Sequence, residues 1–419
     1  MHRILCLAII STMCARAADQ IKLIVLDPGH FHAALVQKEM YPSLDPSVSV
    51  YAPMGPDVVD YLNRIALFNT RNENPTAWKI ELHSGPDFFE RMLQERPGNV
   101  VVLAGRNRPK IDRIEASIDA GLNVLADKPW IISSGDLPRL ERVLDRAAKK
   151  NLVAYDIMTE RFEITSLLQK ALVNDEAVFG KLVSVEARSI HHLMKTVAGV
   201  PLRRPVWFFD VNEYGDGLAD VGTHVIDLVQ WTAFPNDMVD YKKDIRILSA
   251  RRWPTVISRS DFERVTGERE FPASLATHVK DGALHYDCNN SVEYTVRGAH
   301  VALDIRWNWE SADGDVYEAS FQGTKAHVEL RKGELYVAPR THALDDWAAA
   351  IRDTYPGLAI EPHAGEARIV IPPQVRVGHE DHFAQVTNRF FDYLKAPSTL
   401  PAWERSNMLA KYFISTSGN

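Results

Sequence analysis

The stretch Lys22-Leu23-Ile24-Val25-Leu26-Asp27-Pro28-Gly29 contains the first strand-like run of this chain and the turn that follows it. Five residues suited to a buried strand end at Asp27, and Pro28-Gly29 then reverses the chain. The apolar run Ala33-Ala34-Leu35-Val36 follows at once and predicts a helix. A strand, a tight turn and a helix in this order are typical of the parallel sheets of α/β proteins.

The same alternation continues through the first 160 residues. Further buried strands are expected at 48–51, 78–82, 99–104, 123–126 and 152–155, with helices at 58–67, 110–120 and 137–150. Apolar strands separated by helices predict a parallel sheet with helices on both faces. We therefore expect a Rossmann-type domain at residues 18–160, of the kind that binds a dinucleotide.

The second half, residues 161–419, has a different pattern. Apolar residues occupy every second position in runs at 182–187, 291–296, 301–309, 317–322 and 326–330. This period predicts a large open antiparallel sheet with one buried and one partly wet face, in an α+β domain for substrate binding and oligomerisation. Residues 235–285 are polar and predict a long irregular insertion, whereas 379–394 and 403–414 predict two closing helices.

The first 17 residues have the features of a secretory signal peptide. A short basic start at Met1-His2-Arg3 precedes an apolar run over residues 4–14, and Ala15-Arg16-Ala17 fits the small-x-small cleavage rule. The apolar run is too short to span a membrane as a permanent helix. We therefore expect export of the mature protein to the periplasm or the extracellular space.

The composition excludes several classes of partner and site. The chain has 48 Lys and Arg residues against 55 Asp and Glu, and removal of Arg3 and Arg16 with the signal peptide changes the net charge from −7 to −9. No basic run is long enough to bind nucleic acid or an anionic membrane. Cys288 is the sole cysteine after residue 17, so we expect no internal disulfide, no cysteine-rich zinc site and no metal site.

A second informative stretch is Gly215-Asp216-Gly217-Leu218-Ala219-Asp220-Val221-Gly222-Thr223-His224-Val225-Ile226-Asp227. Asp220 and His224 are four residues apart and Asp227 is three residues further, so a helix would present all three on one face. Such a trio fits a helix cap with a hydrogen-bonded core histidine as well as it fits a proton-transfer site. The spacing alone leaves both interpretations open.

The turn after the first strand is an incomplete dinucleotide-binding turn. Of the pattern G-x-G-x-x-G, the sequence Asp27-Pro28-Gly29-His30-Phe31-His32 keeps only the middle glycine, which lets the backbone approach a pyrophosphate. Asp27 would place a negative charge near that pyrophosphate. The acid that holds the adenosine ribose is also missing, since the second strand ends at Ala52-Pro53. On its own, this turn leaves a cofactor site and a simple surface turn both open.

A lysine follows the strand expected at 123–126. Lys128 stands between Asp127 and Pro129, at the carboxyl end of a parallel strand, where the ligands of such sheets collect. In that position it would hydrogen-bond a substrate hydroxyl and assist proton transfer. A surface lysine beside a proline turn is the alternative.

Together these segments resemble the Gfo/Idh/MocA family, the relatives of glucose–fructose oxidoreductase and inositol dehydrogenase. Residues 120–129, AGLNVLADKP, are similar to the family's AG-x-x-V-x-x-EKP signature, with Asp127 in place of glutamate. The family's GGG-x-x-x-D-x-G-x-H-x-x-D segment matches completely from Asp220 to Asp227, whereas Gly215 alone remains of the glycine triplet. The resemblance covers nearly the whole mature chain.

The resemblance implies hydride transfer between a nicotinamide cofactor and a carbon of a sugar or polyol, with NAD favoured over NADP and tightly held. It implies three catalytic residues, namely His224 as proton acceptor, Lys128 as the group that holds the proton and Asp220 as the orienting acid. The residues expected to bind the cofactor are Gly29, His30, Phe31, Gly105, Asn107, Asp127, Lys128 and Pro129. Those expected on the substrate rim are His191, His192, Arg203 and Trp207.

The turn at 27–35 also resembles that of an exported subgroup of this family that carries a "putative oxidoreductase C-terminal" domain. Some members of that subgroup are associated with oxidation of glycosides at C3, which implies a small carbohydrate or glycoside as substrate. Two alternatives stay open: a redox-neutral enzyme that uses bound NAD to cleave a glycoside, and a non-catalytic carbohydrate-binding relative. We also expect copies of the chain to pair through the open antiparallel sheet.

Overall fold

Six parallel strands form the sheet of the first half. The computed structural model describes residues 20–197, 200–312 and 314–418, so the expected signal peptide lies outside the described residues. The strands are β1 (Leu23–Leu26), β2 (Ser47–Ala52), β3 (Lys79–Ser84), β4 (Val100–Leu103), β5 (Asn123–Ala126) and β6 (Ala154–Asp156). Their order is β3-β2-β1-β4-β5-β6, and every neighbouring pair is parallel. This order confirms the Rossmann-type prediction.

Helices connect these strands, mostly as the sequence pattern predicts. They are α1 (His32–Leu35), α2 (Pro56–Thr70), α3 (Phe88–Glu95), α4 (Lys110–Asp119) and α5 (Leu137–Lys149). Two details differ from expectation. The first helix is a single turn of four residues, and α3 was not predicted because eight residues carry only two turns of the helical pattern.

The second half is built on a ten-stranded sheet. Its strands are β7 (Leu182–His192), β10 (Ile245–Ile257), β11 (Val279–Lys280), β12 (Ala283–Val296), β13 (Ala299–Asn308), β14 (Val316–Gly323), β15 (His327–Arg331), β16 (Glu334–Ala338), β17 (Ala359–His363) and β18 (Glu366–Val370). The path is β10-β12-β13-β7-β14-β15-β16-β18-β17, and β11 pairs with β12. All pairs are antiparallel except β13–β7, so the sheet is mixed rather than purely antiparallel.

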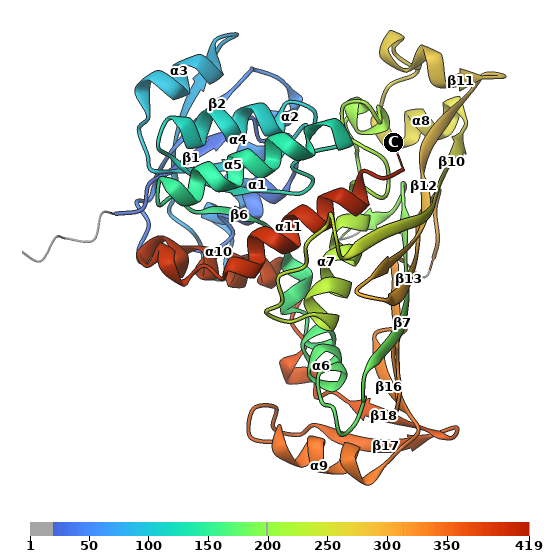
Figure 1. Ribbon diagram of the computed structural model, residues 1–419. Helices are drawn as coiled ribbons and strands as arrows, with labels where there is room; N and C mark the ends of the chain where they lie inside the picture. The colour runs from blue at the N-terminus through green and yellow to red at the C-terminus, as the bar shows by residue number, and fades with distance from the viewer. Residues whose placement is uncertain (1–19, 198–199, 313, 419) are drawn as a thin grey trace, which may run out of the picture.

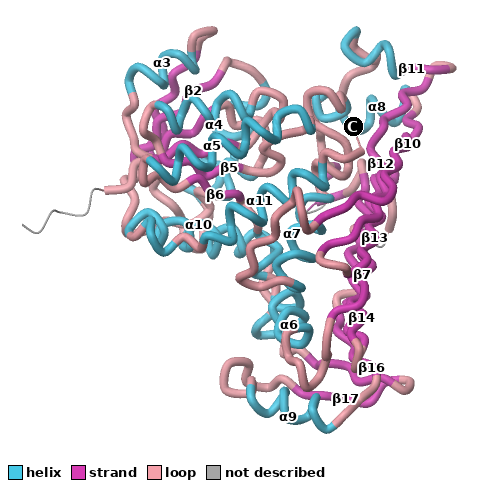
Figure 2. Tube along the Cα trace, in the orientation of Figure 1, coloured by secondary structure: helices cyan, strands magenta, loops and turns pink. Residues whose placement is uncertain are grey.

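One face of this large sheet is buried, as its alternation predicts. In β13, Val301, Leu303, Ile305 and Trp307 are almost fully buried and the residues between them are more exposed. Figures 1 and 2 show α6 (Ile164–Val173) and α7 (Gly222–Ala233) on the face of the large sheet that is turned toward the Rossmann-type domain, with α6 below that domain. The opposite face of the central strands is turned outward.

The prediction of an irregular insertion at 235–285 is wrong. This segment contains β10, which pairs with β12 along its whole length, and α8 (Arg259–Thr266). β10 is an edge strand whose residues between Arg246 and Val256 are half-buried or exposed. A strand with little burial on either face lacks the apolar alternation by which strands are recognised.

The two closing helices, α10 (His379–Lys395) and α11 (Ala402–Ser415), are found close to their predicted positions. Figure 1 shows α10 below the first sheet, and its Phe383, Val386 and Phe390 share an apolar cluster with β1 and β2. The C-terminal segment thus returns to the Rossmann-type unit, whereas the boundary placed at residue 160 stays a prediction. None of the helices in the described ranges is long and apolar enough to cross a membrane.

A buried ionic cluster joins the two halves of the molecule. Arg161, which lies in the 3₁₀ turn after β6, makes a bidentate pair with Asp227 of α7, with N–O distances of 2.6 and 2.7 Å. Its remaining nitrogen donates to Glu404 of α11 at 2.8 Å. Lys411 of α11 donates to Asp156 of β6 at 2.8 Å and to Asp227 at 3.4 Å. All five side chains are at least nine-tenths buried.

The cluster predicts a large loss of stability when one charge is removed. Replacing Arg161 with methionine leaves Asp227 and Glu404 buried without their main partner, and we expect the free energy of unfolding to fall by about 3–5 kcal/mol. Urea unfolding followed by circular dichroism measures this change. The matched control is Arg188→Met, which breaks the half-exposed pair with Glu318 and should cost less than about 1 kcal/mol. Equal losses in the two variants would contradict the interpretation.

Candidate active site

A buried ion pair between Lys128 and Asp220 lies at the carboxyl end of the parallel sheet. Lys128 comes two residues after β5, and Asp220 lies in the turn just before α7. The Lys128 ammonium donates to Asp220 Oδ1, and the two side chains are only 6% and 4% exposed. Burial alone would lower the pKa of Lys128, but Asp220 and Asp127 outweigh it and hold that pKa above its usual value. The lysine is therefore a fixed cation.

His224, in the first turn of α7, faces this cation. Burial, reinforced by the charge of Lys128, lowers the pKa of His224 from 6.5 to about 4. Its Nδ1 is buried and has no hydrogen-bond partner among the described residues. The imidazole is therefore neutral near pH 7. The structure thus brings together the three residues that the sequence proposes as catalytic.

Two further groups belong to the surroundings of His224 and were not predicted. Glu160 accepts a hydrogen bond from His379 Nδ1 at 3.2 Å, and both act electrostatically on His224. Burial opposes ionisation of Glu160, but the hydrogen bond from His379 and the nearby imidazoles bring its pKa down to about 2. Glu160 follows β6 and His379 begins α10, so only the folded chain places them beside α7.

The three polar residues expected on one helix face serve two different sites. α7 begins at Gly222, so Asp220 lies in the preceding turn and bonds Lys128. Asp227 is directed to the buried ionic cluster. Burial would raise its pKa, but Arg161 and Lys411 hold it at about 2. Asp227 therefore anchors α7 in the ionic cluster.

The backbone of the turn after β1 can approach a ligand closely. Asp27, which has a positive φ of 46°, pairs with Arg113 of α4 at 2.6 Å, so the negative charge that seemed unfavourable is neutralised. A Cβ added to Gly105 would lie 2.5 Å from the carbonyl oxygen of Asp27 and 3.0 Å from the nitrogen of Gly29. Only glycine at 105 lets the loop after β4 reach this turn.

The histidines of the turn point inward. His30 Nδ1 lies 2.8 Å from one oxygen of Asp127, and His32 Nδ1 lies 3.0 Å from the other. Burial lowers the pKa of His32 to about 3. These three were expected to surround a cofactor or replace glycines, but they contact one another. Phe31, in contrast, is 39% exposed on the turn.

Two other residues of the expected cofactor set have structural roles. The side-chain amide of Asn107 donates to the carbonyl of Tyr214 at 2.6 Å and accepts from Lys110 at 2.7 Å. Asn107 therefore joins the first unit to the loop before Asp220, and its side chain is not free for a ligand. Pro129 follows Lys128 through a cis peptide bond.

The expected substrate rim is divided. His191 and His192, at the end of β7, both contact Asp315, at 3.2 and 3.3 Å, and His191 also acts electrostatically on Asp220. Arg203 is exposed and donates to the carbonyl of Glu263 in α8, and no hydrogen bond or ion pair among the described residues links it to Lys128 or Asp220.

Trp207 lies against the turn that follows β1. Its Nε1 donates to Asp57 at 3.0 Å, and its ring lies 3.2 Å from where a Cβ of Gly29 would be. Asp57, in the first turn of α2 after β2, was missed because it comes five residues after the position searched for a ribose acid. Trp207 and Asp57 therefore border the turn that begins with Asp27.

Comparison with known proteins identifies the family. The family model described as "Putative oxidoreductase C terminal domain" matches residues 168–419. A crystal structure of a putative oxidoreductase from Parabacteroides merdae is 43% identical in sequence, with a TM-score of 0.92, and the match covers 95% of this chain and 96% of that one. The chain belongs to the Gfo/Idh/MocA family of oxidoreductases.

More distant solved structures share the fold. GenD2 from gentamicin A biosynthesis, solved in complex with NAD, is 14% identical with a TM-score of 0.59, over 95% of this chain and 93% of that one. KijD10, a 3-ketoreductase from Actinomadura kijaniata solved with NADP, is 14% identical with a TM-score of 0.56, over 95% and 96%. None of the curated proteins matches this chain significantly.

The surroundings of His224 predict an unusual titration. The charged groups that act on it are Lys128, Glu160, His379 and Asp127. A folded-state pKa of about 4, below the unfolded value of about 6.5, means that the imidazole stays neutral down to about pH 5. NMR of protein with ¹³C-labelled histidine, assigned with His224→Gln, should show a midpoint near pH 4. Lys128→Met should raise that midpoint, because the cation that opposes protonation is removed. A midpoint above pH 6 in the wild type would contradict this assignment.

Proposed function

We propose that this protein is a nicotinamide-dependent oxidoreductase that acts on a hydroxyl group of a sugar or glycoside. The observation that carries the proposal is the buried Lys128–Asp220 pair beside a neutral His224, at the carboxyl end of a Rossmann-type sheet. Ligands of such sheets bind at this edge. A fixed cation next to a free imidazole is the arrangement that oxidation of an alcohol requires, because the hydroxyl must lose a proton as its carbon loses hydride.

The chain's own residues would divide the proton chemistry among them. Lys128 would donate a hydrogen bond to the substrate oxygen and stabilise the negative charge that develops there. His224 would accept the hydroxyl proton through an imidazole nitrogen, since it is neutral near pH 7. Asp220 would hold the ammonium of Lys128 in place and keep it charged. A nicotinamide ring bound at this edge would supply the hydride acceptor.

The turn after β1 fits a dinucleotide better than its sequence suggests. Asp27 is paired with Arg113, and His32 is only 5% exposed because it is turned toward Asp127. The two side chains that replace glycines therefore do not project from the turn. Gly29, Phe31 and Gly105 would border the cofactor. Binding of NAD by GenD2 and of NADP by KijD10 supports a nicotinamide cofactor, and we favour tightly held NAD.

The finer proposal is oxidation of a glycoside at C3 in an exported protein. Its support is the signal-like sequence of residues 1–17 and the similarity to a 3-ketoreductase fold. A redox-neutral enzyme that cleaves a glycoside with bound NAD is the second candidate, favoured by export to a compartment without a steady supply of cofactor. A non-catalytic carbohydrate-binding relative is the third. We also propose that copies of the chain pair through the outward face of the large sheet. Light scattering would measure the number of chains in each particle.

The first experiment measures cofactor content. Purified protein is denatured, and the released nicotinamides are quantified by mass spectrometry before and after incubation with NAD or NADP. We expect close to one dinucleotide per chain. Absence of both dinucleotides under both conditions would overturn the oxidoreductase proposal and favour the carbohydrate-binding relative.

Arg113 provides a structural test of the cofactor turn. In Arg113→Met, Asp27 loses its partner and its charge repels a pyrophosphate, so we expect dinucleotide affinity to fall by about tenfold or more. The double variant Arg113→Met, Asp27→Asn should restore most of this loss. Isothermal titration calorimetry on the same protein preparations measures both. Unchanged affinity in the single variant would mean that the cofactor binds elsewhere.

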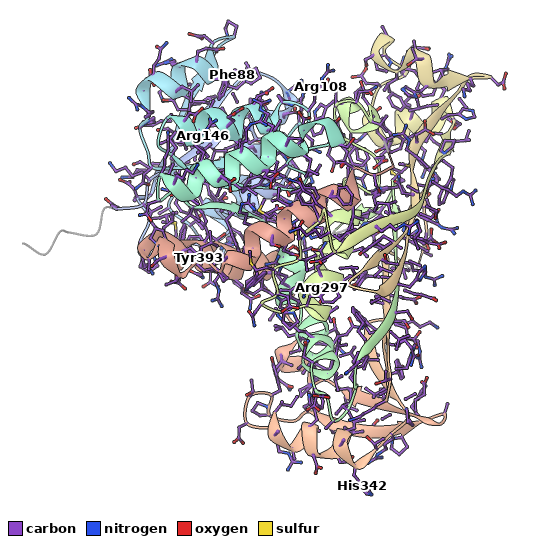
Figure 3. The ribbon with its side chains drawn as sticks, viewed as in Figure 1. Phe88, Arg108, Arg146, Arg297, His342 and Tyr393 are labelled. Atoms are coloured by element: carbon purple, nitrogen blue, oxygen red, sulfur yellow. The ribbon has the colours of Figure 1, made fainter. Side chains whose placement is uncertain are left out.

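Catalysis is tested with simple glycosides in the presence of an electron acceptor. His224→Gln should lower kcat by about 10²–10⁴-fold while cofactor content is retained. Lys128→Ala should also lower it by orders of magnitude. The control is His342→Gln, at the far lower end of the molecule in Figure 3, which should be fully active. A keto product with reduced acceptor indicates net oxidation, whereas cleaved glycoside without reduction indicates the redox-neutral route. Activity that survives both substitutions would refute the site.

A further inference from the structure

Three side chains that could bind a metal ion lie together at the turn after β1. His30 and His32 follow β1, and Asp127 follows β5. Their candidate ligand atoms all lie within 4.8 Å of one another, and His32 and Asp127 are almost fully buried. Each imidazole lies against a different oxygen of the same carboxylate, at 2.8 and 3.0 Å. The proposed hydride transfer assigns no role to this group.

The two histidines contact Asp127 with different geometry. His30 is hydrogen-bonded to Asp127 Oδ2. His32 Nδ1 and Asp127 Oδ1 are both buried and lie 3.0 Å apart, but this contact lacks the alignment of the His30 hydrogen bond. A poorly aligned contact leaves a buried nitrogen and a buried carboxylate oxygen incompletely satisfied. A cation that contacts both atoms would satisfy both.

The distances and the ligand types agree with such a cation. Two ligand atoms that each lie about 2.1 Å from a metal, at right angles to one another, are about 3 Å apart. Both His–Asp distances are close to this value. Two imidazoles and one carboxylate select first-row transition metals, whereas Mg²⁺ and Ca²⁺ favour oxygen ligands alone.

We propose that His30, His32 and Asp127 bind one divalent transition-metal ion of the zinc, manganese, iron or cobalt class. Three protein ligands leave coordination positions for water or for an oxygen of a bound molecule, as in catalytic metal sites. The ion would lie next to Lys128 and fix the turn that we assign to the cofactor. The sequence predicted no metal, because the expectation rested on cysteine number and because Asp127 is 95 residues from His32.

Metal binding by the full mature chain tests the proposal directly. After dialysis against chelator, the protein is titrated with Zn²⁺, Mn²⁺ and Co²⁺ by calorimetry, and bound metal is counted by mass spectrometry. We expect one ion per chain, a rise in Tm on loading, and a cobalt absorption spectrum typical of nitrogen and oxygen ligands. His32→Gln and His30→Gln should each weaken binding by at least about 100-fold, more than is typical for a group that only supports a ligand.

Two comparisons make the result decisive. His30 is partly exposed, so His30→Gln should fold even if His32→Gln does not. His342→Gln removes an exposed histidine far from the site and should bind metal like the wild type. No ion bound by the wild type, or binding that survives both His30→Gln and His32→Gln, would overturn the proposal. Nicotinamide content is measured separately, so failure of the cofactor proposal and failure of the metal proposal are distinguishable.

Discussion

The buried guanidinium group of Arg161 holds the two halves of the molecule together. Arg161 bonds α7 through Asp227 and α11 through Glu404, and Lys411 bonds the same aspartate and the last strand of the first sheet. A buried charge tolerates little displacement from its partners, because any gap leaves desolvation uncompensated. The cluster therefore fixes α7 relative to the Rossmann-type sheet, and with it the distance between Lys128 and Asp220.

The candidate site depends on this position of α7 relative to the Rossmann-type sheet. Lys128 follows β5, whereas Asp220 lies in the turn before α7 and His224 in the first turn of α7, on the other side of the junction. Asn107 adds a second connection by bonding the loop that leads to Asp220. Burial between the two units then sets the electrostatics: Lys128 stays charged, and its charge with desolvation keeps His224 neutral. In either half of the molecule alone, Lys128 and His224 would lose the burial and the partners that set these charge states.

Several features of the site were predictable, and others were not. The strand-and-turn pattern pointed to Lys128 and the motif around Asp220 pointed to His224, and the resemblance to the family gave these residues their expected roles. The inward direction of His32, the pairing of Asp27 with Arg113 and the approach of Glu160 and His379 leave no local trace in the sequence. Each is a contact between segments far apart in the chain. β10 was missed for a related reason, since an edge strand needs no alternating pattern.

The class of the fold, the order of most strands and helices, and the three residues at the centre of the candidate site could be inferred from the amino-acid sequence. These follow from local hydrophobic periodicity and from short motifs, which are properties of neighbouring residues. The folded chain is needed to explain the neutral state of His224, the different partners of Asp220 and Asp227, and the grouping of His30, His32 and Asp127. These depend on burial and on contacts across the junction of the two units, which neighbouring residues do not encode.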